Sequence, residues 1–465
     1  MARRSRADVL RIASSCVDAL DRRLLERERG VLQVGNARIT VARALNESLA
    51  LKVAGVLGSP DVASATSALS VVRRHLYSSR QRLMRPLLRA RGMASWPATA
   101  RTDRNATPLL MVPRRWTHLR DLMPIARYAE STGRYACWWL AFKTDDLETL
   151  RTNGHSAVLV DCFAPPALEA SVRLRLELGM ERLDRTSERP GALDPSEWSL
   201  ALEVMLSELT VMLSQLHLTA RAISRALESV GPRLIVVGSP RTCEGTLAVA
   251  AARAHGIPTL AVQHGQIGVN EAWATCGVDR LAAWGPRSKD TLVKLGFPEE
   301  RIIVTGAPWL DHFALERHTH KAPGARRRIL VALSGAGHSV GMDEHLGHVA
   351  RLMGASQKLP QHTWIYRLHQ KDAPEIYRRM LRDMPGSTGT IVDPRTTEID
   401  IHTHLADIDI LITVTSTAAL DAMLHRIPVV TLGRPPEEPL PPHAQAGATT
   451  HVPMDAPLDE VLASL

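Results

Sequence analysis

The stretch ADIDILITVTSTAALDAMLHRIPVVTLG, residues 406–433, decides the fold of this 465-residue chain. Residues 409–415 are almost all apolar or β-branched, which is typical of a strand buried on both faces. This strand is predicted to end at Ser416 and Thr417, and residues 418–426 follow with the apolar spacing of a helix. A second apolar run then ends at Gly433. The order strand, turn, helix, strand is the repeating unit of a parallel α/β sheet.

The turn at Ser416 and Thr417 has the chemistry of a phosphate site. The first backbone N–H groups of a helix have no partner inside the helix, and the helix dipole places partial positive charge there. Two hydroxyl groups add further donors. A purely structural α/β turn has the same appearance, so the interpretation depends on what the other strand ends carry.

Strands and helices alternate on either side of this stretch. Apolar runs of strand length, most of them followed by a helical pattern, occur at residues 109–112, 136–142, 157–163, 234–237, 259–263, 280–284 and 302–305, and again at 329–333, 364–368, 390–392, 408–414 and 429–432. Such alternation is typical of parallel sheets with right-handed crossovers. A short basic segment at 318–328 separates the two series. We therefore predict an α/β fold with two Rossmann-like domains, residues 106–317 and 325–465, that face a cleft.

Two segments lie outside this alternation. Residues 166–229 contain two long helical patterns, which we assign to the first domain as a helical excursion. Residues 1–105 also have helical spacing and hold 20 Lys and Arg against 8 Asp and Glu, although the whole chain has a net charge of only +9. Such a basic helical region suits an anionic membrane surface. Its arginine-rich part at 71–91 fits equally a helix that packs its leucines on the main body.

Composition narrows the compartment and the chemistry. No apolar run approaches the roughly 18 residues that span a bilayer, and the N-terminus lacks a secretory signal, so we expect a cytoplasmic protein, peripheral on the inner membrane where its basic region binds lipid. The five cysteines include no CxxC pair, which favours a reducing compartment and argues against structural zinc. No nucleic-acid-binding motif accompanies the basic charge, so nucleic acid is not an expected partner.

Polar residues follow two further strands of the second series. Residues 334–339 form a glycine-rich turn that lets backbone approach a phosphate, and residues 367–371 bring cationic and donor groups to the next strand end. A plain tight turn and a solvated strand end are the alternatives. Because ligands of such sheets bind at the carboxyl ends of strands, we predict one phosphate-binding edge. Its candidate residues are Ser334, Gly335, Gly337, His338, His369, Lys371, Ser416 and Thr417.

The first series carries its candidate chemistry in TLAVQHGQIG, residues 259–268. A buried strand delivers Gln263, His264 and Gly265 to a loop, and histidine is the side chain best suited to act as a general base near neutral pH. A histidine satisfied within the core is the alternative. Arg115 and His118, after the first strand of this series, are candidates for binding an acceptor, as is Gln263.

These motifs, with VDRLAAWGPRSKDTLVKLGFPEERIIVTGAPWLD at 278–311, resemble GT-B glycosyltransferases of bacterial surface polysaccharide synthesis over residues 230–435. The most similar are capsule polysaccharide synthesis transferases and the CDP-glycerol glycerophosphotransferases of teichoic acid assembly. The resemblance implies that His264 and Gly265 are the catalytic pair. It also implies that His369 binds the donor phosphate and that Ser416 and Thr417 form the phosphate turn.

The chain departs from this family in three ways. Gln370 stands where the family has proline, Thr417 replaces a second serine, and the Glu-x7-Glu pair of retaining transferases is absent, which leaves Asp421 as the nearest acidic residue for a ribose. Residues 302–311 and the segment GRPPEEP also resemble UDP-N-acetylglucosamine 2-epimerases, which have Ser-Gly-Gly and Glu-Glu where this chain has Ser416-Thr417-Ala418 and Leu420-Asp421. A third hypothesis is that the chain is a catalytically inactive GT-B scaffold in a membrane assembly complex.

The mechanism expected from these motifs is transfer from a nucleotide-activated donor that is CMP-, CDP- or UDP-linked. The second domain would hold the donor phosphates, and His264 would remove the proton of an acceptor hydroxyl as the new bond forms. The acceptor would be a growing saccharide or a lipid-linked molecule. The scheme calls for no metal and no cofactor besides the donor.

Overall fold

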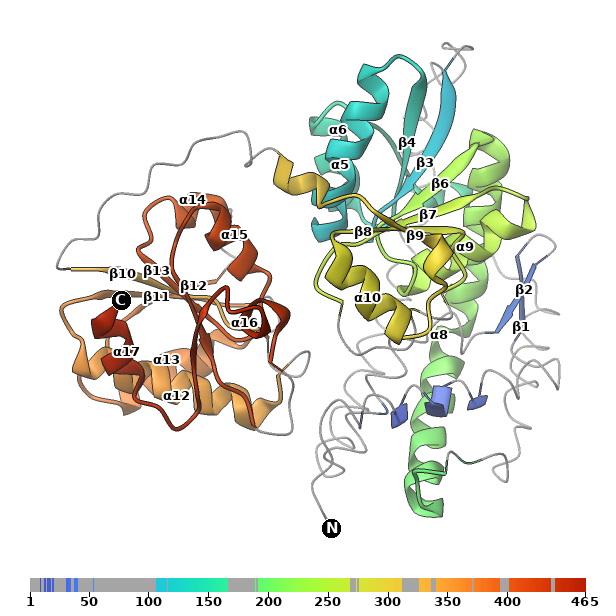
Figure 1. Cartoon of the computed structure of the whole chain (residues 1–465). Helices are drawn as coiled ribbons and strands as arrows, with labels where there is room; N and C mark the ends of the chain where they lie inside the picture. The colour runs from blue at the N-terminus through green and yellow to red at the C-terminus, as the bar shows by residue number, and fades with distance from the viewer. Residues whose placement is uncertain are drawn as a thin grey trace. The chain divides into compact units, whose positions relative to one another are not determined.

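The computed structural model divides the chain into two compact units, Met1–Leu310 and Asp311–Leu465, each described here by itself (Figure 1). It describes residues 106–114, 116–165, 189, 191–267, 273, 276–311, 326–335, 340–369, 372–393, 401–435 and 440–465, together with residues 9, 12, 13, 15–17, 19, 20, 31–34, 37–40 and 53. Residues 318–325 of the linker predicted at 318–328 lie outside the described residues, and its last residue, Arg328, begins the first strand of the second unit.

The first unit is built on a seven-stranded parallel sheet with the order β5-β4-β3-β6-β7-β8-β9. Its strands are β3 (Thr107–Val112), β4 (Tyr135–Ala141), β5 (Ser156–Leu159), β6 (Leu234–Val237), β7 (Thr259–Val262), β8 (Arg280–Ala283) and β9 (Ile302–Val304). Its helices are α5 (Trp116–Ser131), α6 (Thr144–Thr152), α8 (Pro195–Val230), α9 (Cys243–Ala254) and α10 (Pro286–Lys294), with short 3-10 turns η2 (Val160–Phe163), η4 (Glu299–Arg301) and η5 (Pro308–Leu310). The chain runs outward from β3 to β5 and returns to pair β6 with β3, so the strand order reverses between β3 and β6.

The second unit repeats this topology with six parallel strands in the order β12-β11-β10-β13-β14-β15. Its strands are β10 (Arg328–Val331), β11 (Thr363–Arg367), β12 (Thr390–Val392), β13 (Ile410–Thr413), β14 (Val429–Leu432) and β15 (Thr450–Val452). Its helices are α12 (Met342–Lys358), α13 (Pro374–Asp383), α14 (Ile401–Leu405), α15 (Ala418–Leu424), α16 (Pro442–Gln445) and α17 (Leu458–Ser464). Here the order reverses between β10 and β13.

The core of the second unit explains why its strands are continuous apolar runs. Ile329 and Val331 of β10 pack into one hydrophobic cluster, whereas Leu330 and Ala332 pack into another. Successive side chains of a strand point to opposite faces, so both faces of the sheet are covered. The stretch at 406–433 supplies β13, α15 and β14 to this arrangement, as its pattern predicts.

The predicted strands are found in both sheets with ends that differ by one or two residues, but three details were wrong. Residues 160–163 form a 3-10 turn and not the second half of a strand. Strand β15 was not predicted, because a three-residue strand leaves almost no periodic signal. Residues 1–105 are not uniformly helical, since β1 (Val31–Val34) and β2 (Ala37–Thr40) form an antiparallel pair. The intervening Gly-Asn dipeptide is a hairpin signal that the helical interpretation overlooked.

The described part of the N-terminal region belongs to the first unit. The described residues between 9 and 20 are helical, and Cys16, Val17 and Leu20 are buried in the same core as the first sheet. The hairpin contacts α8 and α9. This portion therefore packs on the main body, and the segment at 71–91, for which a membrane surface was the other interpretation, lies outside the described residues.

The helical excursion begins beyond the described residues and ends in a single long helix. Helix α8 has 36 residues and starts at a capping box in which Asp194 accepts hydrogen bonds from the Ser196 and Glu197 N–H groups. It ends at Gly231, whose positive φ of 60° is a left-handed cap. The residues assigned to the excursion at 166–188 lie outside the described part. Among the helices that the structure describes, none is long and apolar enough to cross a membrane.

Candidate functional site

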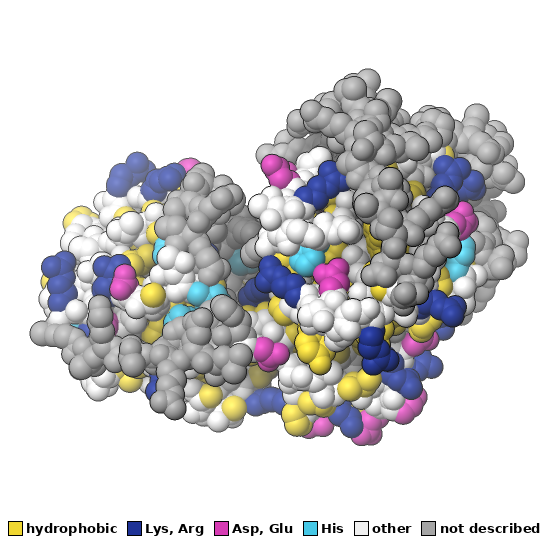
Figure 2. Space-filling model, turned by 90° about the horizontal axis from the view of Figure 1, so that it is seen from above, with side chains coloured by type: hydrophobic (Ala, Val, Ile, Leu, Met, Phe, Trp, Pro, Cys, Tyr) yellow, Lys and Arg dark blue, Asp and Glu magenta, His cyan; other side chains and the backbone are white. Residues whose placement is uncertain are grey.

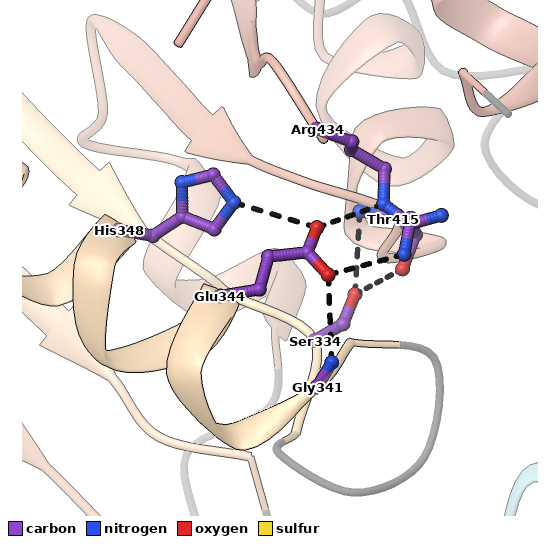
Figure 3. Close-up of polar contacts among 6 residues, drawn as sticks. All are labelled: Ser334, Gly341, Glu344, His348, Thr415 and Arg434. Carbon is purple, nitrogen blue, oxygen red and sulfur yellow. Dashed lines mark hydrogen bonds and ion pairs between the residues drawn. The ribbon is translucent and has the colours of Figure 1, made fainter. Parts of the chain in front are cut away.

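Two hydroxyl groups join the strand ends at the point where the order of the second sheet reverses. Ser334 lies just beyond β10 and Thr415 just beyond β13, and their side-chain oxygens are 2.5 Å apart (Figure 3). The Thr415 backbone N–H also donates to Ser334 Oγ at 3.3 Å, and Thr413 Oγ1 donates to the Ala332 carbonyl. Ligands of open α/β sheets bind at such a reversal, outside the carboxyl ends of the strands. Ser334 therefore lies at the carboxyl end of β10, beside the reversal of the strand order.

His369 lies directly on Gly335. A Cβ atom added to Gly335 would be 2.1 Å from His369 Nδ1, so only a glycine leaves room for the ring. The His369 backbone N–H donates to Asp372 Oδ2 at 2.9 Å, and the Asp372 N–H returns a bond to the His369 carbonyl. Two predicted residues, from the ends of β10 and β11, are therefore in contact.

Asp372 is held in turn by a buried aromatic and imidazole pair. The Tyr377 hydroxyl lies 3.2 Å from Asp372 Oδ2 and 3.0 Å from His345 Nε2. Burial lowers the pKa of His345, although Asp372 opposes this effect. Burial and the Asp372 charge raise the pKa of Tyr377 above its ordinary range, so its hydroxyl stays protonated. Asp372, Tyr377 and His345 therefore fix the backbone at His369, and their contacts were not predicted.

A buried ion pair lies at the same edge of the second sheet. Arg434, just after β14, contacts Glu344 of α12 through two bonds, Nε to Oε1 at 2.9 Å and Nη2 to Oε2 at 3.3 Å (Figure 3). His348 Nε2 is 3.7 Å from Glu344 Oε1, and the Gly341 N–H donates to Oε2. Burial alone would raise the pKa of Glu344, but the nearby His348 and Arg434 lower it to about 2. The carboxylate is therefore charged at neutral pH and anchors the start of α12 to β14.

The turn at Ser416 and Thr417 precedes a short helix. The Ser416 hydroxyl accepts a hydrogen bond from the Ala418 N–H at 3.3 Å, while Thr417 makes no side-chain cap. Helix α15 has only 7 residues, so its dipole is smaller than that of a long helix. Both residues are half-buried at the end of β13.

Asp421, the residue predicted to lie nearest a ribose, is buried beside His402. Its side chain is 3% exposed, and its Oδ1 lies 3.7 Å from His402 Nε2. His402 Nδ1 is in turn 3.1 Å from His425 Nε2, with the two rings stacked. The carboxylate is thus engaged between α14 and α15, because one helical turn carries it away from the strand ends and into the packed face of α15.

In the first unit the structure brings two predicted histidines together. His118, in the first turn of α5, and His264, just after β7, have ring centroids 4.3 Å apart with planes inclined by 59°. His118 is fully buried and accepts a hydrogen bond from the Arg114 backbone N–H at Nδ1, 3.1 Å away. A Cβ atom at Gly238, just after β6, would be 2.5 Å from His118 Cβ. The pair therefore lies where β3 and β6 meet, at the reversal of the first sheet.

Gln263 supports the loop that carries His264. Its side chain is 1% exposed, its Nε2 donates to the Gly265 carbonyl at 2.8 Å, and its Oε1 accepts the Trp284 backbone N–H at 2.8 Å. The Trp284 indole donates to the Gln263 carbonyl. The nitrogen and the oxygen of the Gln263 side-chain amide are both bonded within the unit, so this residue positions the Gly265 loop. The sequence had indicated an acceptor contact for it.

Four predicted residues, Arg115, Gly337, His338 and Lys371, lie outside the described residues. Next to the first of them, Arg114 pairs with Glu244 of α9 at 2.6 Å. Figure 2 shows Lys and Arg as well as Asp and Glu side chains scattered over the described surface among uncharged ones.

Sequence reasoning missed Thr415, Glu344 and Arg434. Thr415 is one residue before the predicted turn, and its partner Ser334 is 81 residues away. Glu344 and Arg434 are 90 residues apart and come from a helix and a strand end that no periodic pattern connects. A capping-box spacing, with Glu344 three residues after Gly341, was the one local signal for this network.

No protein-family model and no curated protein matches the chain, but solved structures do. One is assigned as a UDP-N-acetylglucosamine 2-epimerase from Listeria monocytogenes, with 13% identity, a TM-score of 0.50, and coverage of 77% of this chain and 87% of that one. A second is MurG from Acinetobacter baumannii, with 14% identity, a TM-score of 0.42, and coverage of 77% of this chain and 89% of that one. A third is a glycosyltransferase from Rickettsia africae, with 12% identity, a TM-score of 0.45, and coverage of 77% of this chain and 88% of that one. The similarity is one of fold. The predicted fold class, two Rossmann-like α/β domains of the GT-B type, is confirmed.

Proposed function

We propose that the protein is a glycosyltransferase, or a glycerophosphate-type transferase, that moves a group from a nucleotide-activated donor to a surface polysaccharide or lipid-linked acceptor. One observation carries the proposal. Residues singled out as phosphate-binding from separate strand ends, Ser334, Gly335 and His369, meet at one sheet edge, with His369 seated on Gly335. The named activities of the similarly folded proteins, UDP-sugar epimerase and glycosyltransferase, support a nucleotide-sugar substrate.

The second unit is the donor side in this proposal. Backbone and hydroxyl donors of Ser334, Ser416 and Thr417, with the His369 ring, would neutralise charge on the phosphates as the nucleotide leaves. Gly335 gives the phosphate close access to backbone. The neighbouring Gly337, His338 and Lys371, beyond the described residues, complete the proposed donor set. Asp421 is left out, since it is buried against His402.

The first unit supplies the base. His264, half-buried beside Gly265, would take the proton of the acceptor hydroxyl while that oxygen forms a bond to the donor and the nucleotide leaves with the bonding electrons. Arg115 and His118 lie on the acceptor side of this scheme. Gln263 is assigned to hold the His264 loop through its bonds to Gly265 and Trp284. The scheme calls for no metal.

A 2-epimerase is the alternative. The structure from Listeria monocytogenes that is assigned as an epimerase has a similar fold, which favours this alternative. Against it stands Asp421, which occupies the place of an acidic pair in those enzymes and is buried toward His402. Incubation with UDP-N-acetylglucosamine alone distinguishes the two, because an epimerase forms product without any acceptor. An inactive GT-B scaffold would bind no nucleotide productively and form neither product.

The proposed acceptor is a saccharide or a lipid-linked molecule of the cell envelope. The resemblance to capsule and teichoic acid enzymes points to a cell-envelope polymer, and the basic residues of 1–105 would hold the enzyme on the inner leaflet, at about 1 kcal/mol for each one near the surface. We place the enzyme in the cytoplasm, peripheral on that membrane. Flotation of the full chain with anionic and neutral liposomes tests this, and equal behaviour with both would count against it.

A thermal-shift panel tests the proposed activity. The full chain is titrated with CMP, CDP, UDP and their sugar or glycerol adducts, and one nucleotide class should raise the melting temperature. With the donor so found, His264→Ala should keep the thermal shift and lose transfer. The matched control is His155→Asn, a buried histidine at the amino end of β5 in the same sheet, which should keep both. No shift with any nucleotide would remove the transferase and the epimerase together.

A further inference from the structure

His118 is buried in contact with the ring of His264 and packs closely on the backbone at Gly238. The two centroids are 4.3 Å apart, and the absence of a side chain at Gly238 makes space for His118 Cβ and Nδ1. His118 comes from α5 and His264 from the loop after β7, while Gly238 follows β6, which lies between β3 and β7 in the sheet. Three neighbouring strands therefore place this pair.

The hydrogen bond to Nδ1 decides the protonation state of His118. The Arg114 backbone N–H donates to this nitrogen, so Nδ1 must present a lone pair, and we assign the ring proton to Nε2. An imidazolium carries hydrogen on both nitrogens and would turn an N–H toward the Arg114 N–H. Full burial of the ring also opposes a charge. His118 is therefore the neutral member of the pair.

Among the described residues, the charged side chains that flank His118 in the sequence are themselves paired. Arg114 and Glu244 of α9 neutralise each other at 2.6 Å. On α5, Arg120 contacts Asp121 at 3.4 Å and stacks over Trp309. The side chain next to His264 on its own loop is the uncharged amide of Gln263.

We propose that His118 is a positioning residue, held as a neutral imidazole by the Arg114 N–H, that fixes the His264 ring and leaves His264 to carry the transferred proton alone. Two adjacent imidazoles that both titrated would repel each other once both were charged. A neighbour that stays neutral lets His264 accept a proton without that opposition. This inference rests on the proposed role of His264, and it replaces the acceptor contact indicated for His118 by the sequence.

The first test is a histidine-selective NMR titration of the full chain, with the two rings assigned by loss of signals in His118→Gln and His264→Gln. Between about pH 5.5 and 8, the range in which histidine ordinarily titrates, His118 should keep the signature of the Nε2–H tautomer while His264 titrates. A His118 ring that titrates in this range, or that carries its proton on Nδ1, overturns the proposal. This readout needs no substrate, so it remains decisive if the proposed transferase activity fails.

The second test separates positioning from packing. His118→Asn keeps an acceptor for the Arg114 N–H but removes the ring, and His118→Phe keeps a neutral ring but removes the acceptor. With the donor identified, His118→Asn should lower kcat at least about tenfold with little change in KM for the donor, and both variants should move the midpoint of the acidic limb of the pH–rate profile. His155→Asn should leave that midpoint in place. Unchanged midpoints in both His118 variants, with kcat retained, would contradict the proposal, whereas full activity in His264→Ala would contradict the proposed function itself.

Discussion

Gly335 is the residue on which the donor side of the proposed site depends, because its missing side chain is what admits His369. Gly335→Ala would place a methyl group 2.1 Å from His369 Nδ1, and the ring must move. We expect the nucleotide-induced thermal shift to fall by at least half while the protein stays folded. The control is Gly354→Ala in α12, where the added Cβ would meet no atom within 4 Å beyond its chain neighbours and the helix's own backbone, and where alanine favours the helix. Equal nucleotide shifts in the two variants would count against His369 as a ligand-binding residue.

The Glu344–Arg434 pair makes a prediction about stability. Both side chains are under a tenth exposed, so Glu344→Gln leaves a buried guanidinium without its counter-charge and should lower the free energy of unfolding by about 3 kcal/mol. Glu375→Gln is the matched control, since it breaks an exposed pair with Arg378 on α13 and should cost less than about 1 kcal/mol. Urea unfolding of the full chain at neutral pH measures both. A loss no larger for Glu344→Gln than for Glu375→Gln would show that the buried pair contributes little.

The lowered pKa of Glu344 predicts that its contribution to folding stability depends on pH in the acid range. The pKa of Glu344 is lowered from 4.5 to about 2 in the folded state, so its contribution is complete above pH 4.5 and is lost as the pH falls toward 2. The difference in unfolding free energy between the wild type and Glu344→Gln should be constant above pH 4.5 and should narrow as the pH falls from 4.5 toward 2. A difference that stays constant down to the lowest pH at which the protein folds would contradict the assignment.

A buried histidine in helix α16, His443, predicts a second pH dependence of the folding stability, in this case from a base that stays neutral in the folded state. Burial lowers the pKa of His443 from 6.5 to about 4, so between these values the unfolded chain binds a proton that the folded unit does not. Stability should therefore fall as the pH drops from 6.5 to 4, with a slope of at most about 1.4 kcal/mol per pH unit from this residue. His443→Leu should flatten the slope, and unfolding curves at several pH values measure it. Identical slopes in the two proteins would show that His443 titrates normally.

Most helices and strands could be predicted from the sequence, because each buried strand is a continuous apolar run bounded by polar residues. The hairpin β1–β2 was lost inside a long region assigned as helix, and β15 is too short for a pattern. The positions of His264 and Ser334 at strand ends could also be predicted, because once the strands are assigned, the carboxyl ends of parallel strands lie at one edge of the sheet. The contacts of Glu344 with Arg434 and of His118 with His264 join residues far apart in the chain, and no local rule connects them.

At the scale of the whole molecule, two Rossmann-like units with separate cores should respond differently to a nucleotide. In the proposed function the donor binds the second unit, so the ligand-binding energy should appear there, about 2.7 kcal/mol at a nucleotide concentration one hundred times its Kd. Hydrogen exchange of the full chain should therefore slow at the ends of β10, β11 and β13 and remain unchanged around His264. His264→Ala should leave this pattern intact, because it alters only the base. Protection confined instead to the first unit would reverse the assignment of donor and acceptor sides, and His264 would then belong to the nucleotide site.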